Sequence, residues 1–166
     1  WREAYLYAPL ETSNTIVGSE AADAFAQGYA ALQRGEPDVA AAQRARFPEF
    51  QARVASRPDY TLPGAVHALS RALDAAIAFQ AGRRDEALLI LDEANRIEDG
   101  MPVEFGPPSI VKPTWELRGE FLLAMNRPGE AKEAFTRSLA LQPNRWLSVQ
   151  GLAEADRALA TPRGGR

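Results

Sequence analysis

Apolar residues recur along the chain at helical spacing, and the stretches that carry them end at glycine, asparagine or proline. The segment 84–97 is the clearest case, because Leu88, Leu91 and Ala94 would share one face of a helix. Gly or Asn just past a helix and Pro just inside the next one are typical of helix ends. The pattern predicts seven helices, at 19–34, 37–56 with a kink or restart at Pro48, 64–81, 84–97, 113–126, 128–141 and 145–159.

The order of helix, tight turn and helix occurs three times and is followed by a single helix. Residues 19–160 are therefore predicted to form one domain of three hairpins with a C-terminal capping helix. Residues 1–18 would be a linker from a preceding part of a longer chain, and residues 161–166 would be a tail.

Two longer connections, at about 48–62 and 98–112, are expected to bulge from the hairpins. The second is rich in proline and glycine, which predicts an irregular but ordered loop. Two interpretations remain open for this loop. It could be a contact surface, or it could cover an apolar flank with Phe105, Ile110 and Val111 as plugs.

The composition supports helices and narrows the chemistry. The chain has 166 residues, of which 31 are alanine, and its β-branched residues are few, so an all-α fold is expected. There is no cysteine, which excludes disulfides, thiolate metal sites and cysteine nucleophiles. The single histidine, His67, excludes a multi-histidine metal centre and has no neighbouring serine or acid to form a catalytic set.

Charge and hydropathy argue against nucleic-acid binding and against a membrane span. The net charge is −3, and the arginines alternate with acidic residues, so there is no basic patch for nucleic acid. No apolar stretch approaches roughly 18 residues, so no membrane span is expected. The sequence thus predicts neither a metal, nor a cofactor, nor a catalytic centre.

The segment 112–145 carries large and small residues at a recurring spacing. Gly119 and Ala131 lack bulk where the two helices of a hairpin would cross, and Trp115 and Phe135 would fill the space beside that crossing. Together with Pro143, these residues give the segment a specific resemblance to the tetratricopeptide repeat.

The resemblance has departures and weaker copies. The consensus leucine before the glycine is Arg118 here, with Leu117 one place early, and Leu122 replaces a tyrosine. The alternative is a generic alanine-rich bundle, but the match and the unpaired last helix favour a right-handed α-α superhelix with a cap. Aligned on their turns, the other hairpins place Gly28, Ala40, Ala75, Ala87 and Leu91 at repeat positions.

The resemblance implies a function in binding rather than catalysis. Tetratricopeptide repeats bind proteins or peptides on a concave surface lined by the first helix of each hairpin. The candidate residues lack the lysines and asparagines with which family members hold a peptide's terminal carboxylate, so no such clamp is expected. The candidates on those helices are Phe25, Tyr29, Ala72, Ala76, Phe79, Glu116, Glu120 and Leu123.

The chemistry of these candidates leaves two interpretations. Phe25, Tyr29 and Phe79 suit an apolar helix or an extended segment, while Glu116 and Glu120 would favour a basic group on it. Alternatively, the aromatic side chains pack on the chain's own N-terminal segment or on the 98–112 loop.

The leading hypothesis is a non-catalytic scaffold that binds a protein or peptide partner. One alternative is the accessory end of a larger enzyme or sensor whose functional residues precede Trp1. Another is self-association, because a repeat stack that is cut at Trp1 would expose an apolar end. The last hairpin also resembles the C-terminal end of long bacterial repeat proteins. Because the absence of cysteine suits both compartments, the bacterial cytoplasm and the periplasm both remain open.

Overall fold

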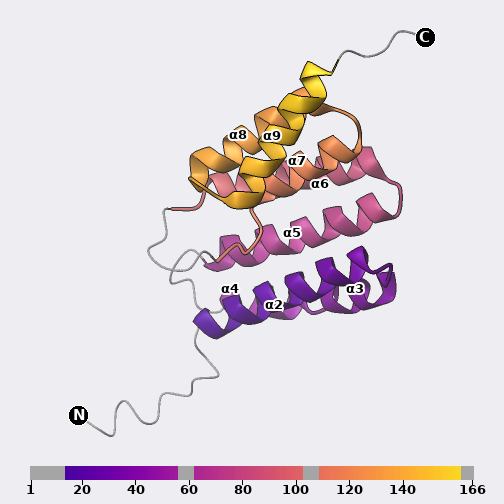
Figure 1. Ribbon diagram of the computed structural model, residues 1–166. Coiled ribbons are helices and arrows are strands. Elements are labelled where there is room, and N and C mark those ends of the chain that lie inside the picture. Colours follow the sequence, from indigo (N-terminus) through magenta and orange to yellow (C-terminus); the bar gives the residue numbers. More distant parts are fainter. Residues whose placement is uncertain (1–13, 56–61, 103–108, 162–166) are drawn as a thin grey trace, which may run out of the picture.

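The computed structural model describes residues 14–55, 62–102 and 109–161, and this part of the chain is helical without strands (Figure 1). The all-α prediction is confirmed. The predicted linker before residue 14 and the tail after residue 161 lie outside the described residues. The helices are α2 (Asn14–Gln33), α3 (Pro37–Arg44), α4 (Phe47–Ala55), α5 (Leu62–Gln80), α6 (Arg84–Asp99), α7 (Thr114–Ala124), α8 (Pro128–Leu141) and α9 (Trp146–Ala160).

The start of the first helix differs from the prediction by five residues, whereas the other predicted helix ends agree to within about two residues. Helix α2 begins at Asn14, so residues 14–18, which the sequence analysis assigned to a linker, belong to the helix. The kink or restart predicted at Pro48 in the segment 37–56 is a restart, because α3 ends at Arg44 and α4 begins at Phe47. Pro48 is the second residue of α4, where its missing N–H leaves no hydrogen bond unmade.

The three hairpins are closed by the same turn. Gly35, Gly82 and Asn126 have positive φ values of 75°, 81° and 56°, and the next helix begins two residues later in each case. This left-handed residue lets the chain close the helix end with a hydrogen bond from the following amide, as in a Schellman motif. The three bonds run from Glu36 N to Ala31 O (2.9 Å), from Arg83 N to Ala78 O (3.0 Å) and from Arg127 N to Leu122 O (2.9 Å).

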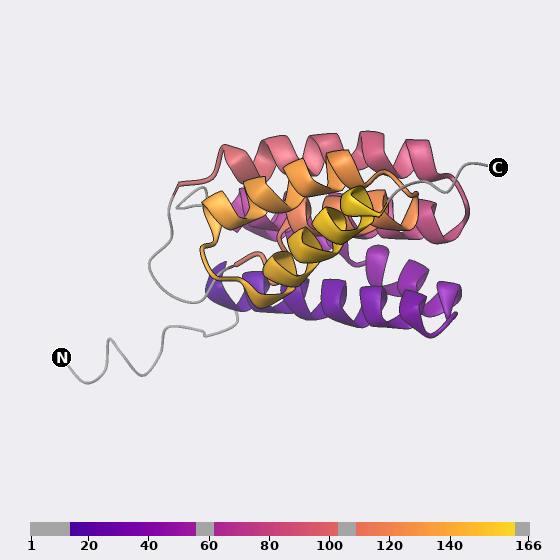
Figure 2. The ribbon, with the colours of Figure 1, turned by 45° about the horizontal axis from the view of Figure 1, so that its top comes forward.

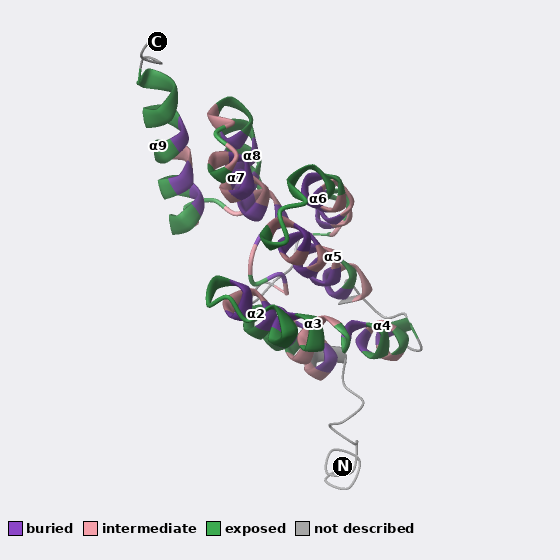
Figure 3. Cartoon of the chain, turned by 90° about the vertical axis from the view of Figure 1, so that its right-hand side faces the viewer, coloured by how far each residue is buried: buried purple, intermediate pink, exposed green. Residues whose placement is uncertain are grey.

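Each turn brings two helices side by side: α2 with α3, α5 with α6, and α7 with α8 (Figures 1 and 2). The first helices of the hairpins are also neighbours, because α5 packs against both α2 and α7. Helix α9 packs against α8 and α7 and turns its buried face toward them (Figure 3). The buried residues of α9 are Ser148, Gly151 and Ala155. The predicted order of three hairpins and a final single helix is thus present.

The connection at 48–62 was expected to bulge from the hairpins, but its described part packs against them. Helix α4 packs against α5 and α2, and it buries Phe47, Phe50 and Val54 completely or nearly so. These three residues lie on one face of the short helix, and burying that apolar face holds α4 against the core.

In the connection at 98–112, Ile110 is buried, which agrees with the interpretation that this loop covers an apolar flank. Val111 is 41% exposed, so its assignment as a plug is wrong. Phe105 lies outside the described residues.

Phe135 on α8 joins the last three helices. A Cβ atom added to Gly119 on α7 would come within 2.7 Å of the Phe135 ring, and one added to Gly151 on α9 within 2.3 Å. Both distances are shorter than atoms tolerate, so both positions need glycine for the helices to approach this closely. Gly119 had been predicted at a crossing, whereas Gly151 had not.

Most of the other positions that the sequence analysis assigned to the repeat are buried or lie at close contacts. Ala40, Ala75, Ala87, Leu91 and Ala131 are fully buried. At Gly28, an added Cβ would lie 2.9 Å from the side chain of Leu73. Trp115 donates from Nε1 to Asp99 at 3.0 Å, while Pro143 is exposed.

The departure at Arg118 has a structural reason. Leu117 takes the buried position, and Arg118 instead reaches back to α6, where it donates to the Asp92 carboxylate at 2.7 Å and to the Leu88 carbonyl at 3.2 Å. The second and third hairpins are therefore joined by an ion pair beside the apolar contact.

Glu98 near the end of α6 fixes the start of α7. Its carboxylate accepts hydrogen bonds from the Thr114 amide at 2.7 Å and from the Thr114 hydroxyl at 2.5 Å. The residue before α7 is Pro113, whose side chain cannot cap a helix, so Glu98 supplies the missing acceptor from another helix.

The left-handed turns give a first prediction. Gly82→Ala should lower the free energy of unfolding by roughly 1–2 kcal/mol, because the strain of positive φ falls on a side-chain-bearing residue. Gly129→Ala is the matched control. Neither position has an atom within 4 Å of the new Cβ, but Gly129 lies inside α8 without a positive φ. Its replacement should leave stability unchanged or raise it by up to about 1 kcal/mol. Urea unfolding of both variants tests this, and equal effects would contradict it.

Candidate binding site between the first helices of the hairpins

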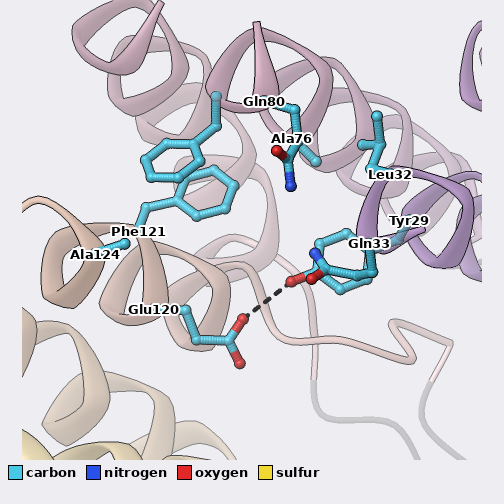
Figure 4. Close-up of a pocket in the computed structure, with 9 residues that line it drawn as sticks. Tyr29, Leu32, Gln33, Ala76, Gln80, Glu120, Phe121 and Ala124 are labelled. Carbon is cyan, nitrogen blue, oxygen red and sulfur yellow. Dashed lines mark hydrogen bonds between the residues drawn. The ribbon is translucent and has the colours of Figure 1, made fainter. Parts of the chain in front are cut away.

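A pocket of about 240 Å³ lies between α2, α5 and α7, the first helices of the three hairpins (Figure 4). Every residue that lines it comes from the last five residues of one of these helices. Three helix C-termini therefore converge on the pocket. The lining residues are Tyr29, Leu32 and Gln33 from α2, Ala76, Phe79 and Gln80 from α5, and Glu120, Phe121 and Ala124 from α7.

Aromatic rings form two sides of the pocket. The rings of Phe79 and Phe121 are stacked, with their centroids 4.0 Å apart and their planes inclined by 14°. Tyr29 is stacked on Phe25 at 5.8 Å, and Phe25 itself is almost completely buried. The α5–α7 pair and the α2 pair thus present rigid apolar surfaces to the space between them.

Glu120 gives the pocket its charge. One carboxylate oxygen accepts a hydrogen bond from the Tyr29 hydroxyl at 3.2 Å, and the other accepts one from Lys112 at 2.7 Å. The ammonium of Lys112 also lies 5.5 Å from the centre of the Tyr29 ring. Burial and the Glu120 carboxylate raise the pKa of Tyr29 above its ordinary value, so its hydroxyl keeps its proton and acts as a donor to Glu120.

Glu116 lies one helical turn before Glu120 but does not reach the pocket. Its side chain is fully buried and accepts hydrogen bonds from Arg145 at 2.7 and 3.0 Å, from Ser148 at 2.7 Å and from Lys112 at 3.2 Å. Burial alone would raise the pKa of Glu116, but the bonds from Arg145 and Ser148 and the charge of Lys112 outweigh it and hold the pKa below its ordinary value.

The predicted site residues fall into rows, one residue from each first helix. One predicted row is buried rather than available to a ligand. Its members are Phe25 and Ala72, which lie in the core, and Glu116, which lies in the ion-pair cluster. The row one turn further on, Tyr29, Ala76 and Glu120, lines the pocket. In the next row Phe79 lines the pocket, whereas Leu123 packs half-buried against the core.

The sequence analysis missed five lining residues, Leu32, Gln33, Gln80, Phe121 and Ala124. Three of them form the last row. Gln33, Gln80 and Ala124 lie one helical turn after Tyr29, Ala76 and Glu120, at the final residue of each helix. Extending the predicted rows by one turn toward the hairpin turns would have found them.

Other chemistry is sparse in the described part of the chain. His67 is exposed on α5. The described residues contain no group of three or more His, Cys, Asp or Glu side chains placed to hold a metal ion. None of the helices described is both long and apolar enough to cross a bilayer. No family model, curated protein or solved structure matches the chain.

The two buried carboxylates give a second prediction, about pH. The lowered pKa of Glu116 means that its contribution to stability is complete above the ordinary carboxyl pKa and is lost as the pH falls through the lower folded value. For Glu98, burial raises the pKa despite the hydrogen bonds from Thr114, so the folded state loses stability as the pH rises through the raised value.

The replacements Glu116→Gln and Glu98→Gln should therefore change stability with opposite pH trends. The advantage of the wild type over Glu116→Gln should be larger at pH 6 than at pH 3. The advantage of the wild type over Glu98→Gln should shrink between pH 4 and pH 7. Urea unfolding across this range measures both differences, and trends of the same sign would contradict the prediction.

Proposed function

We propose that this chain is a non-catalytic binding module of tetratricopeptide-like hairpins, and that the pocket between α2, α5 and α7 belongs to a concave groove that takes a peptide segment of a partner protein. The observation that carries this proposal is which helices supply the residues that line the pocket. Each of the three hairpins contributes the end of its first helix and nothing from its second helix.

The repeat relationship is supported by local geometry at equivalent positions. The same left-handed turn closes each hairpin, and glycines at α7 and α9 admit the ring of Phe135. Under this proposal the hairpins and α9 follow one another in a right-handed superhelix, with α2, α5 and α7 on its inner side. Such an arrangement gives a continuous surface for an extended ligand.

The pocket favours a side chain of the peptide rather than its terminal carboxylate. Among the described residues that line it, Glu120 carries the only charge, and it is negative. Lys112 is nearby but is held by Glu116 and Glu120. A peptide carboxylate would face Glu120 without a cationic partner, which is unfavourable.

Peptide selection tests the proposal. A library of random peptides is panned against the immobilised chain, and the selected peptides are then measured against two variants. Ala124→Trp places a bulky side chain at the rim of the pocket, and Ala42→Trp places the same side chain on the exposed surface of α3.

Both alanines are exposed, so neither change should disturb the core. Binding should fall at least tenfold in Ala124→Trp and stay unchanged in Ala42→Trp. Selected peptides whose affinity is the same for both variants would contradict the proposed groove, as would a panning that selects none.

A further inference from the structure

We infer that the pocket recognises the guanidinium group of an arginine side chain in the bound peptide, with Glu120 as its carboxylate partner. This inference rests on the proposed function and specifies the chemistry of its ligand. Helix ends, hydrogen-bond acceptors, aromatic rings and pocket size support it independently.

The first argument is the charge of the helix ends. The C-terminus of a helix carries about half a negative charge, which a basic residue in the last turn normally offsets. Helices α2, α5 and α7, which end at the pocket, have no basic residue in their last turn. Of the other five helices described, α3, α4, α6 and α9 carry Arg44, Arg53, Arg96 and Arg157 there, and only α8 has none.

The arginines that follow the three helix ends do not offset this charge at the pocket, because each is paired with the beginning of the next helix. Each of these arginines binds a glutamate two or three residues later. The pairs are Arg34 with Glu36 at 2.7 Å, Arg83 with Glu86 at 2.8 Å and Arg127 with Glu130 at 2.5 Å. The three C-termini therefore face the pocket without a cation of their own in the last turn.

The second argument is the set of acceptors. The Glu120 side chain is 34% exposed, so a ligand can reach it. Each of its oxygens has one described partner, Tyr29 or Lys112, and a carboxylate can accept about four hydrogen bonds. The side-chain amides of Gln33 and Gln80 point into the same space (Figure 4). Neither amide has a hydrogen-bond partner among the described residues, so both oxygens can accept from a ligand.

The third argument is the behaviour of the aromatic rings. The chain's own cations already lie against two of them, with Lys112 5.5 Å from the Tyr29 ring centre and Arg84 5.8 Å from the Phe79 ring centre. These contacts show that the local environment is compatible with cation–π interaction. A planar guanidinium that takes the place of one of these cations can stack on the ring and donate hydrogen bonds from its edge at the same time.

The size of the pocket and its number of hydrogen-bond acceptors favour an arginine side chain. A volume of about 240 Å³ lies below the range of roughly 300–1,000 Å³ for whole small-molecule ligands, which suits one long side chain. Acceptors from α2, α5 and α7 surround the space, and guanidinium has five N–H donors in a fixed fork, whereas an ammonium concentrates three on one atom.

The experiment is an NMR titration of the ¹⁵N-labelled chain with N-acetyl-arginine N-methylamide. Its matched control is the citrulline analogue, which has the same shape without the charge. The arginine compound should shift the backbone amides of Gln33, Gln80 and Ala124, and the citrulline compound should bind at least tenfold more weakly. Equal binding of the two compounds, or shifts confined to other helices, would overturn the inference.

Variants of the chain locate the interaction. Glu120→Gln should weaken binding of the arginine compound at least tenfold, while Glu133→Gln, an exposed change on α8, should leave it unchanged. Gln80→Leu alters an exposed residue without touching the Lys112 cluster, and it should weaken binding about threefold. Unaltered affinity in both Glu120→Gln and Gln80→Leu would contradict the assignment.

The two experiments distinguish a failure of the arginine inference from a failure of the proposed function. Peptides that need an open pocket but keep their affinity when arginine is replaced by citrulline would remove the arginine assignment and leave the proposed function intact. Binding of the arginine compound at the pocket without any selected peptide would retain the assignment and remove the peptide-binding function.

Discussion

The buried carboxylate of Glu116 is the contact on which the arrangement of the last hairpin depends. A fully buried charge is tolerated only with partners, and this one has Arg145 and Ser148 from the region of α9 and Lys112 from the connection before α7. The chain must therefore place α9 and residues 109–113 around α7. Phe135 completes the same junction from the apolar side, between two glycines.

The Glu116 cluster also determines where the pocket lies. Lys112 forms ion pairs with both Glu116 and Glu120, and Glu120 also accepts a hydrogen bond from Tyr29 on α2. One set of polar contacts therefore joins the first hairpin to the last. These contacts lie between α2 and α7, toward Glu116. The pocket remains where they end, beside the C-termini of α2, α5 and α7.

This arrangement separates the two carboxylates by role. Glu116 has its full set of partners inside the protein, so it contributes to stability and its pKa is held low. Glu120 is one turn away, shares Lys112, and keeps part of its surface at the pocket. An acidic group beside aromatic rings and helix C-termini is suited to a cation, whereas a carboxylate clamp would need the opposite charges.

The sequence by itself determined the helices, the turns and the all-α fold, because Gly35, Gly82 and Asn126 act through local backbone conformation and apolar spacing acts within one helix. It also placed the candidate residues on α2, α5 and α7, the helices whose ends line the pocket. Only the tertiary structure decided that the row containing Phe25 and Glu116 is closed and that the row containing Gln33 and Gln80 is open. That choice depends on Lys112 and Arg145, which reach α7 from other segments, and helical periodicity carries no information about such contacts.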